Sequence, residues 1–212
     1  RYLMEGIIVK NFGNPEVMII DYLNLPEPGP NEVVIKVIAT GVNPVDTYIR
    51  SGGYKNPPLL PYTPGKDGSG IIHNIGINVT SFNIGERVYF FGSKTGSYAQ
   101  YTICSITNVF SLPSDITFEQ GACLGTPAFT AYRALFDKGK SKPGEKVFIH
   151  GASGGVGLFA VEMAKSIGME VIGTASTSEG IEAVLNAGAS EVFNHHDSHY
   201  IEEIQRKYPQ GF

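Results

Sequence analysis

The residues with the clearest chemical potential form a glycine-rich stretch, Gly151–Gly157 (GASGGVG), directly after the apolar run 147–149. An apolar helical pattern follows from about Leu158 to Ile167, and a second apolar run, 171–175, ends at Ser176. This order of strand, tight turn, helix and strand within about thirty residues is that of a βαβ unit. The stretch therefore predicts a strand-to-helix turn in a parallel sheet.

The glycine spacing Ala152-x-Gly154-x-x-Gly157 fits the pattern G-x-G-x-x-G, with alanine in the first place. We expect Gly154 to leave room for a pyrophosphate against the backbone, and Gly157 to let the helix pack closely on the strand. Free N–H groups and the helix dipole favour a phosphate at this point. In this context the motif predicts a dinucleotide site rather than a plain glycine-rich turn.

The end of the second strand, Thr174–Ser178, bears on the choice between NADP(H) and NAD(H). An NAD-selective site usually has Asp or Glu here to bind the ribose 2′-OH, and this chain has hydroxyl side chains instead. Hydroxyl groups can bond to a 2′-phosphate, so the sequence favours NADP(H). However, no Arg or Lys follows within the next ten residues, and Glu179 and Glu182 are unfavourable neighbours for a phosphate.

Composition limits the class of protein. The chain has 212 residues, 42% hydrophobic and 17% charged, which indicates one large or two modest globular domains. The net charge of −4 argues against a nonspecific nucleic-acid binder, and no apolar run is long enough for a membrane span. Two cysteines make no disulfide framework, so we expect a cytoplasmic protein.

The two ends of the chain suggest that it is incomplete. It begins at Arg1 without a methionine and stops soon after an expected helix, Tyr200–Tyr208. A doubly wound sheet should continue with a further strand at this point. We therefore expect either a fragment or a longer polypeptide.

Residues up to about 115 favour short strands with Gly/Pro turns, which is typical of a compact barrel. Thr117-x-x-Gln120 is a plausible capping box, and Pro127–Lys138 has an amphipathic helical pattern. The expected strands and the short helix lie at 7–9, 17–20, 32–40, 70–76, 86–91, 97–103 and 108–112, with the helix after Gly41.

Several stretches together resemble one family. They are GVNPVDTYIRSGGY (41–54), PLLPYTPGKDGSG (58–70), FTAYRAL (129–135), HGASGGVG (150–157) and GASEVFNH (188–195). The chain resembles the medium-chain dehydrogenase/reductase superfamily, and within it the zeta-crystallin-type NADPH:quinone oxidoreductases.

The resemblance implies an α/β fold: a GroES-like β-rich barrel, the catalytic and substrate domain, at 1–120, and a Rossmann-type coenzyme domain at 121–212. Of the doubly wound parallel sheet only the first half is present. The family's last third, which includes a dimerisation strand, lies outside the chain. The resemblance also implies a homo-oligomer for the full-length protein.

Zinc-dependent members of the superfamily have a Cys ligand where this chain has Asn43, and Gly-His-Glu where it has Gly65-Lys66-Asp67. A catalytic zinc normally takes three His, Cys or carboxylate ligands. We therefore expect a zinc-independent reductase with no metal site. Lys66 also departs from the small or apolar residues of the family, so it is expected to alter substrate or cofactor preference if it reaches the active-site cleft.

By resemblance, Asn43 and Tyr48 are the expected catalytic residues. Asn43 would hold the nicotinamide carboxamide or a substrate carbonyl, and Tyr48 would bond the ribose or the reduced carbonyl oxygen. If the resemblance is set aside, the sequence around these residues favours a simpler interpretation. Tyr48 would be a half-buried aromatic residue, and Asn43 a turn residue before Pro44. The expected NADPH-binding residues are Tyr48, Ser153, Gly154, Gly155, Val156, Gly157, Ser176 and His195.

The implied activity is NADPH-dependent reduction of small-molecule quinones or activated enones, without a membrane partner. The alternative is a non-enzymatic crystallin-like or RNA-binding relative that retains the NADPH site; the acidic charge argues against strong RNA binding.

For the other polar and aromatic residues, the sequence indicates structural roles more than catalytic or metal-binding ones. His195-His196-Asp197 with His199 is more consistent with a polar turn than with a metal site, and Cys123 with packing than with a nucleophile. Tyr54, Tyr62 and Phe91 are candidates for an apolar substrate pocket. Asp46 is expected to be a helix N-terminal carboxylate.

Overall fold

The computed structural model describes residues 2–212, and the chain divides into two compact units between Thr126 and Pro127. Each unit has its own hydrophobic core. The expected domain limit at 120/121 falls within α2 (Phe118–Ala122), which packs on strands of the first unit. No helix among the described residues has the length and apolar character needed to span a membrane.

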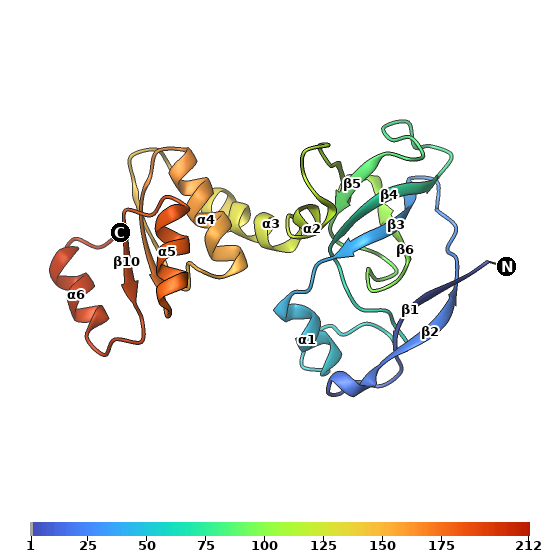
Figure 1. Cartoon of the computed structure of the whole chain (residues 1–212), viewed down its shortest axis with the longest axis horizontal. Coiled ribbons are helices and arrows are strands. Elements are labelled where there is room, and N and C mark those ends of the chain that lie inside the picture. The colour runs from blue at the N-terminus through green and yellow to red at the C-terminus, as the bar shows by residue number, and fades with distance from the viewer. Residues whose placement is uncertain (1) are drawn as a thin grey trace. The chain divides into compact units, whose positions relative to one another are not determined.

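The first unit consists mainly of short antiparallel strands (Figure 1). A five-stranded sheet has the order β6-β3-β4-β5-β7, and β1 and β2 form a separate two-stranded ribbon. Isolated bridges of Gly6 with Ala99 and of Val9 with Tyr62 connect the ribbon to nearby loops. The strands are β1 (Leu3–Val9), β2 (Met18–Asn24), β3 (Glu32–Thr40), β4 (Gly68–Ile75), β5 (Arg87–Phe90), β6 (Tyr101–Ser105) and β7 (Val109–Ser111).

The helices of the first unit are short. α1 (Pro44–Arg50) follows β3, and α2 packs against β3, β4 and β5. The predicted capping box of α2 is confirmed: the Gln120 N–H donates to the Thr117 hydroxyl at 3.2 Å, and the Thr117 N–H donates to Gln120 Oε1 at 2.9 Å. Two 3₁₀ turns, η1 (Pro15–Val17) and η2 (Ile106–Asn108), precede β2 and β7.

β3 is the central strand of the first unit and agrees with the expected strand at 32–40. Its residues are largely β-branched, and Val33, Val34 and Ile35 are completely buried. β3 pairs with both β4 and β6, so neither of its edges faces solvent over that stretch. The strand therefore fixes the position of α1, which begins four residues after it ends.

The expected strand at 97–103 is partly wrong. The regular strand β6 begins only at Tyr101. The preceding residues bond to other segments: the Gln100 N–H donates to the Glu5 carbonyl at 3.0 Å, and the Ile7 N–H donates to the Tyr98 carbonyl at 2.8 Å. The Ser97 and Tyr98 N–H groups donate to the Gly65 and Pro64 carbonyls, and the Gln100 carbonyl accepts the Val37 N–H of β3 at 2.9 Å. The segment is thus extended, as its alternation predicts, but before Tyr101 its backbone groups pair mostly outside the five-stranded sheet.

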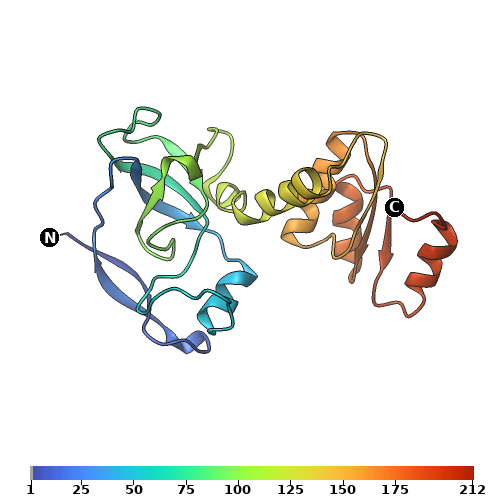
Figure 2. The ribbon, with the colours of Figure 1, turned by 180° about the vertical axis from the view of Figure 1, so that it is seen from behind.

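The second unit is a three-stranded parallel sheet with helices on both faces (Figure 2). Its strand order is β10-β9-β8, as in the first half of a classical dinucleotide-binding sheet. The elements are α3 (Thr126–Tyr132), the π-helical segment η3 (Arg133–Lys138), β8 (Lys146–Ile149), α4 (Gly155–Ser166), β9 (Glu170–Ala175), α5 (Ser178–Asn186), β10 (Glu191–Asn194) and α6 (Tyr200–Lys207).

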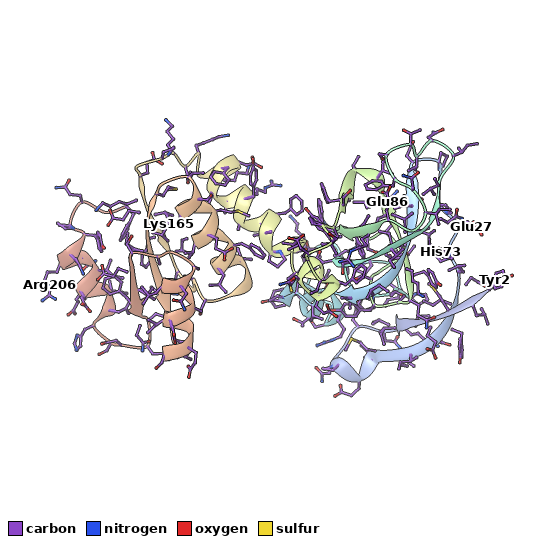
Figure 3. The ribbon with its side chains drawn as sticks, turned by 45° about the horizontal axis from the view of Figure 1, so that its top comes forward. Tyr2, Glu27, His73, Glu86, Lys165 and Arg206 are labelled. Atoms are coloured by element: carbon purple, nitrogen blue, oxygen red, sulfur yellow. The ribbon has the colours of Figure 1, made fainter. Side chains whose placement is uncertain are left out.

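The two faces of the sheet bury alternate residues of β9. Val171 and Ala175 pack in a cluster that includes side chains of α4 and α5, whereas Ile172 packs with Phe193 and Ile204 under α6. The period of two is that of a strand buried on both sides. Lys165 on α4 and Arg206 on α6 are exposed on these two helices (Figure 3).

The helix expected at Pro127–Lys138 is present, but its second half is a π-helix. The Gly139 N–H donates to the Ala134 carbonyl, five residues earlier, at 2.8 Å. The wider turn keeps Leu135 in the core of the second unit. A 3.6-residue pattern does not distinguish this local widening from a regular helix.

Candidate functional site

The turn between β8 and α4 leaves the start of α4 open. Gly154 is the N-cap residue, in an extended conformation, and no side chain caps the helix. The first helical hydrogen bond runs from the Leu158 N–H to the Gly154 carbonyl at 2.9 Å. The N–H groups of Gly155 and Val156 are therefore without a partner among the described residues, and both residues are exposed. This is the arrangement that binds a phosphate at a helix N-terminus.

Gly157 holds the turn close to the helix. A Cβ atom at this position would lie 2.6 Å from the Ala152 Cα, the Ala152 oxygen and the Gly151 oxygen, all of which are backbone atoms. Gly157 and Ala152 are both buried. At Gly154 a Cβ would meet only the Gly151 oxygen, at 3.4 Å. The packing expected for Gly157 is thus present, and Gly154 lies in open space as a phosphate contact requires.

Thr174 connects the carboxyl ends of all three strands. Its hydroxyl oxygen accepts the Gly151 N–H at 2.9 Å and lies 3.1 Å from His150 Nδ1 and 3.2 Å from His195 Nδ1. Thr174 is completely buried. A hydroxyl has one proton and two lone pairs, so it can donate to one imidazole while it accepts from the other. Sequence reasoning missed this role, because nothing local marks a strand threonine as a hydrogen-bond centre.

Ser176 directly follows β9, at the edge of the sheet where α4 begins, and is half-buried. Thr177 has a separate role, because its hydroxyl accepts the Gly180 N–H at 3.0 Å as the N-cap of α5. Glu179 lies exposed in the first turn of α5. Of the hydroxyl groups at the end of β9, those of Ser176 and Ser178 make no hydrogen bond to the described residues.

His195 carries a testable pH dependence. Burial, followed by the nearby His150 and His196, lowers the pKa of His195 below its usual value. Protonation thus favours the unfolded chain, so we expect stability to be constant above a pH of about 6.5 and to fall as pH drops through it. NMR titration of the imidazole should give a reduced pKa.

Because His150 is one of the causes, His150→Ala should return the His195 pKa toward normal. His73→Ala, a change in the first unit, should leave it unaltered. A His195 pKa at or above the usual value in the wild-type protein would contradict the described geometry.

In the first unit, a buried carboxylate holds Asn43. Asp67 is completely buried and accepts three hydrogen bonds: from Asn43 Nδ2 at 2.8 Å, from the Thr126 N–H at 2.7 Å and from the Thr126 hydroxyl at 2.6 Å. Asn43 is the N-cap of α1 and only 7% exposed. One amide hydrogen is thus engaged, and the Asn43 side chain also forms a capping box with Asp46 at the start of α1. Sequence reasoning treated Asp67 only as a replaced zinc position and missed Thr126.

Asp46 is a helix N-terminal carboxylate, as expected. Its Oδ2 atom accepts the Asn43 N–H at 2.9 Å, and the Tyr98 hydroxyl donates to the same oxygen at 3.3 Å. Burial raises the pKa of Asp46 above its usual value, although the two hydrogen bonds partly oppose this. The arrangement holds the first turn of α1, the element that carries both Asn43 and Tyr48.

Tyr48 lies on the same helix and is 58% exposed, so it is not the half-buried core aromatic of the alternative interpretation. Its hydroxyl makes no hydrogen bond to the described residues. The structure thus brings Asn43 and Tyr48 onto one short helix, with the Asn43 side chain fixed and the Tyr48 side chain accessible. Their catalytic roles remain predictions.

The first unit also contains a cavity of about 970 Å³. Tyr54 and Tyr62 line it, as expected. Phe91 does not; it stacks on Phe110, with ring centroids 6.2 Å apart. Phe91 follows β5, which pairs with β7 near Phe110, so sheet pairing brings the two rings together. Asp46, Lys66 and Thr126 also line the cavity.

The described residues, 2–212, contain no group of three or more His, Cys, Asp or Glu side chains that could hold a metal ion. At the positions that the sequence comparison matched to zinc ligands, Asn43 donates to Asp67, and the Lys66 ammonium donates to the Ser93 carbonyl at 3.2 Å. In the histidine-rich turn, His199 lies 3.3 Å from Glu202 on α6, while His195 bonds to Thr174. Neither set of side chains fits a zinc ion.

Two family models match the chain: the alcohol dehydrogenase GroES-like domain at residues 29–114 and the zinc-binding dehydrogenase at residues 155–212. Human quinone oxidoreductase is 48% identical over 205 residues, which is 96% of this chain and 62% of the human protein. The chain thus spans less than two thirds of the length of that curated relative.

Solved structures agree with this likeness. Escherichia coli quinone oxidoreductase complexed with NADPH has a TM-score of 0.87 and 34% identity over 97% of this chain and 63% of that one. An NAD-dependent alcohol dehydrogenase has a TM-score of 0.90 and 27% identity over 97% and 68%. The expected GroES-like and Rossmann-type architecture is confirmed. The chain belongs to the medium-chain dehydrogenase/reductase superfamily, in its quinone oxidoreductase group.

Proposed function

We propose that the intact protein that carries this chain is a zinc-independent, NADPH-dependent reductase of quinones or activated enones. The observation that carries the proposal is the uncapped, exposed start of α4 directly after β8, in a chain 48% identical to human quinone oxidoreductase. NADPH supplies reducing equivalents when bound, and the protein's part is to bind, orient and shield.

In this proposal the N–H groups of Gly155 and Val156 bind the pyrophosphate, with Ser153, Gly154 and Gly157 forming the turn around it. The lack of a side-chain cap and the exposure of these residues support the assignment. Ser176 binds the adenosine 2′-phosphate, and His195, held by Thr174, contacts the adenosine end. The alcohol dehydrogenase likeness is equally close in fold, so the fold alone does not choose between NADPH and NADH.

We infer that Asn43 and Tyr48 act on the substrate side. The Asn43 amide, fixed by Asp67, offers a hydrogen bond of set direction to a carbonyl oxygen on which charge builds during reduction. The Tyr48 hydroxyl is accessible and unpaired among the described residues, so it can donate to the ribose or to the same oxygen. Tyr48→Phe in the intact enzyme should lower kcat for a quinone.

Coenzyme choice is tested at Ser176. Ser176→Asp places a carboxylate where the 2′-phosphate would bind, and we expect NADPH affinity to fall by about tenfold or more while NADH affinity is retained or improved. Titration of the intact protein with each coenzyme, followed by tyrosine fluorescence or thermal shift, measures both. Ser178→Ala, two residues further on at the start of α5, is the control and should change neither affinity by more than about twofold.

Wild-type preference for NADH would contradict the assignment of Ser176 while leaving the fold unchanged. Tight NADPH binding without turnover of quinones or enones would instead support the non-enzymatic relative that retains the coenzyme site. Binding of neither coenzyme would overturn the proposed function.

A further inference from the structure

The walls of the cavity in the first unit are mostly apolar. They come from three separate segments: Met4, Ile8 and Leu23 on the β1–β2 ribbon, Val45 and Ile49 on α1, and Pro61 in the following loop. At about 970 Å³ the cavity is large enough for a fused-ring molecule. A site of this kind binds through apolar contact and takes its specificity from a few polar groups.

Three charged residues line the cavity, and two of them are already satisfied. Lys94 pairs with Glu32. Asp46 is only 6% exposed and accepts hydrogen bonds from the Asn43 N–H and the Tyr98 hydroxyl. The third, Lys66, has no carboxylate within 4.0 Å among the described residues and donates only to the neutral Ser93 carbonyl.

Lys66 is therefore a cation without a direct ion-pair partner, although the Asp46 carboxylate is near enough to interact with it electrostatically. Lys66 is exposed, so its ammonium retains hydrogens for a further acceptor. The hydroxyl of Tyr62, another lining residue, is buried without a hydrogen-bond partner among the described residues. A ligand oxygen that reached it after a small side-chain shift would satisfy a group that is otherwise unpaired.

We propose that this cavity takes a planar, apolar molecule with one anionic oxygen, an ionised hydroxyquinone, and that the Lys66 ammonium pairs with that oxygen. The inference rests on the proposed function, because it names the substrate class of the same reductase. Asn43 and Tyr48 do not themselves line the cavity, but Val45, Asp46 and Ile49 of the same helix do. Lys66 is then a specificity-determining residue. A neutral quinone of the same shape gains the apolar contacts and lacks the ion pair.

The test compares two ligands of nearly equal size. The probe 2-hydroxy-1,4-naphthoquinone is a vinylogous carboxylic acid and is ionised at neutral pH, whereas 2-methoxy-1,4-naphthoquinone has no charge. We expect the wild-type intact protein to bind the hydroxyquinone more tightly. Lys66→Met should reduce that affinity about five- to tenfold and leave the methoxyquinone affinity unchanged. Calorimetry without coenzyme measures binding alone.

Lys55→Met is the matched control. Lys55 is exposed and lies between Tyr54 and Asn56, which both line the cavity, but does not line it itself. Equal wild-type affinity for the two ligands, or equal losses in the two variants, would overturn the proposal. NADPH is titrated on the same proteins: failure to bind NADPH would overturn the proposed function, whereas a preference that depends on Lys66 would still support the anionic ligand.

Discussion

Replacement of Gly157 by alanine is expected to destabilise the second unit by about 3 kcal/mol and to lower its melting temperature by at least about 6 °C. The added Cβ would lie 2.6 Å from three backbone atoms of Gly151 and Ala152, which cannot rotate away as a side chain can. The turn must shift to relieve the contact, and the N–H groups of Gly155 and Val156 move with it. NADPH affinity should therefore fall together with stability.

Gly155→Ala is the matched control for this prediction, since it adds the same methyl group two residues earlier in the same helix. Its Cβ would meet only Pro127, at 3.8 Å, which is ordinary van der Waals contact. We expect no loss of stability, and a gain of up to about 1 kcal/mol because alanine restricts the unfolded chain. Calorimetric melting of both variants checks the pair. Equal melting temperatures would show that the turn is not packed as described.

Removal of the Asp67 carboxylate is expected to have a comparable effect on the first unit. Asp67→Ala would leave the Asn43 amide and the N–H and hydroxyl of Thr126 without their acceptor. Each unsatisfied buried donor costs about 1–3 kcal/mol, so we expect a loss of about 3–5 kcal/mol in denaturant unfolding. In the intact enzyme, kcat should also fall, because the Asn43 side chain loses the group that orients it.

Asp21→Ala is the control, because it removes an exposed carboxylate and not a buried one. Asp21 is on β2 and is 41% exposed, with Lys10 at 3.3 Å as its ion-pair partner. Exposed ion pairs contribute little to stability, so this variant should unfold close to the wild-type denaturant midpoint. Asp67→Asn, which keeps the shape but presents an amide to the same donors, should lie between the two. An Asp67→Asn variant as stable as the wild type would contradict the three-donor arrangement.

The elements that carry the coenzyme assignment were predictable because their signals are local. The turn at 151–157 needs small residues because its backbone atoms pack against residues only a few positions away in the same segment. The strand at 32–40 is β-branched along its length, and the capping box of α2 spans three residues. Such features depend on backbone conformation and near neighbours, which the sequence specifies directly.

Features that join distant segments were not predictable in the same way. Asn43 and Asp67 are 24 residues apart, and Thr126 is a further 59 from Asp67. The sequence predicts one strand at 97–103, yet the Tyr98 carbonyl and the Gln100 N–H pair with β1, and the Ser97 N–H donates to Gly65. The alternation showed that the segment is extended, but it did not show which neighbour pairs with it, because many partners present equivalent backbone groups.

Local sequence patterns were enough to predict the class of each unit, the glycine-rich turn after β8, and the short helix at Asn43 and Tyr48. The three-dimensional arrangement was needed to show that Asp67 fixes Asn43, that Thr174 joins His150 and His195, and that Lys66 lines an apolar cavity without a direct ion-pair partner among the described residues. The physical reason is that local propensity and periodicity are encoded over a few residues. Which side chains form hydrogen bonds with one another depends instead on the strand order and register that bring distant segments together.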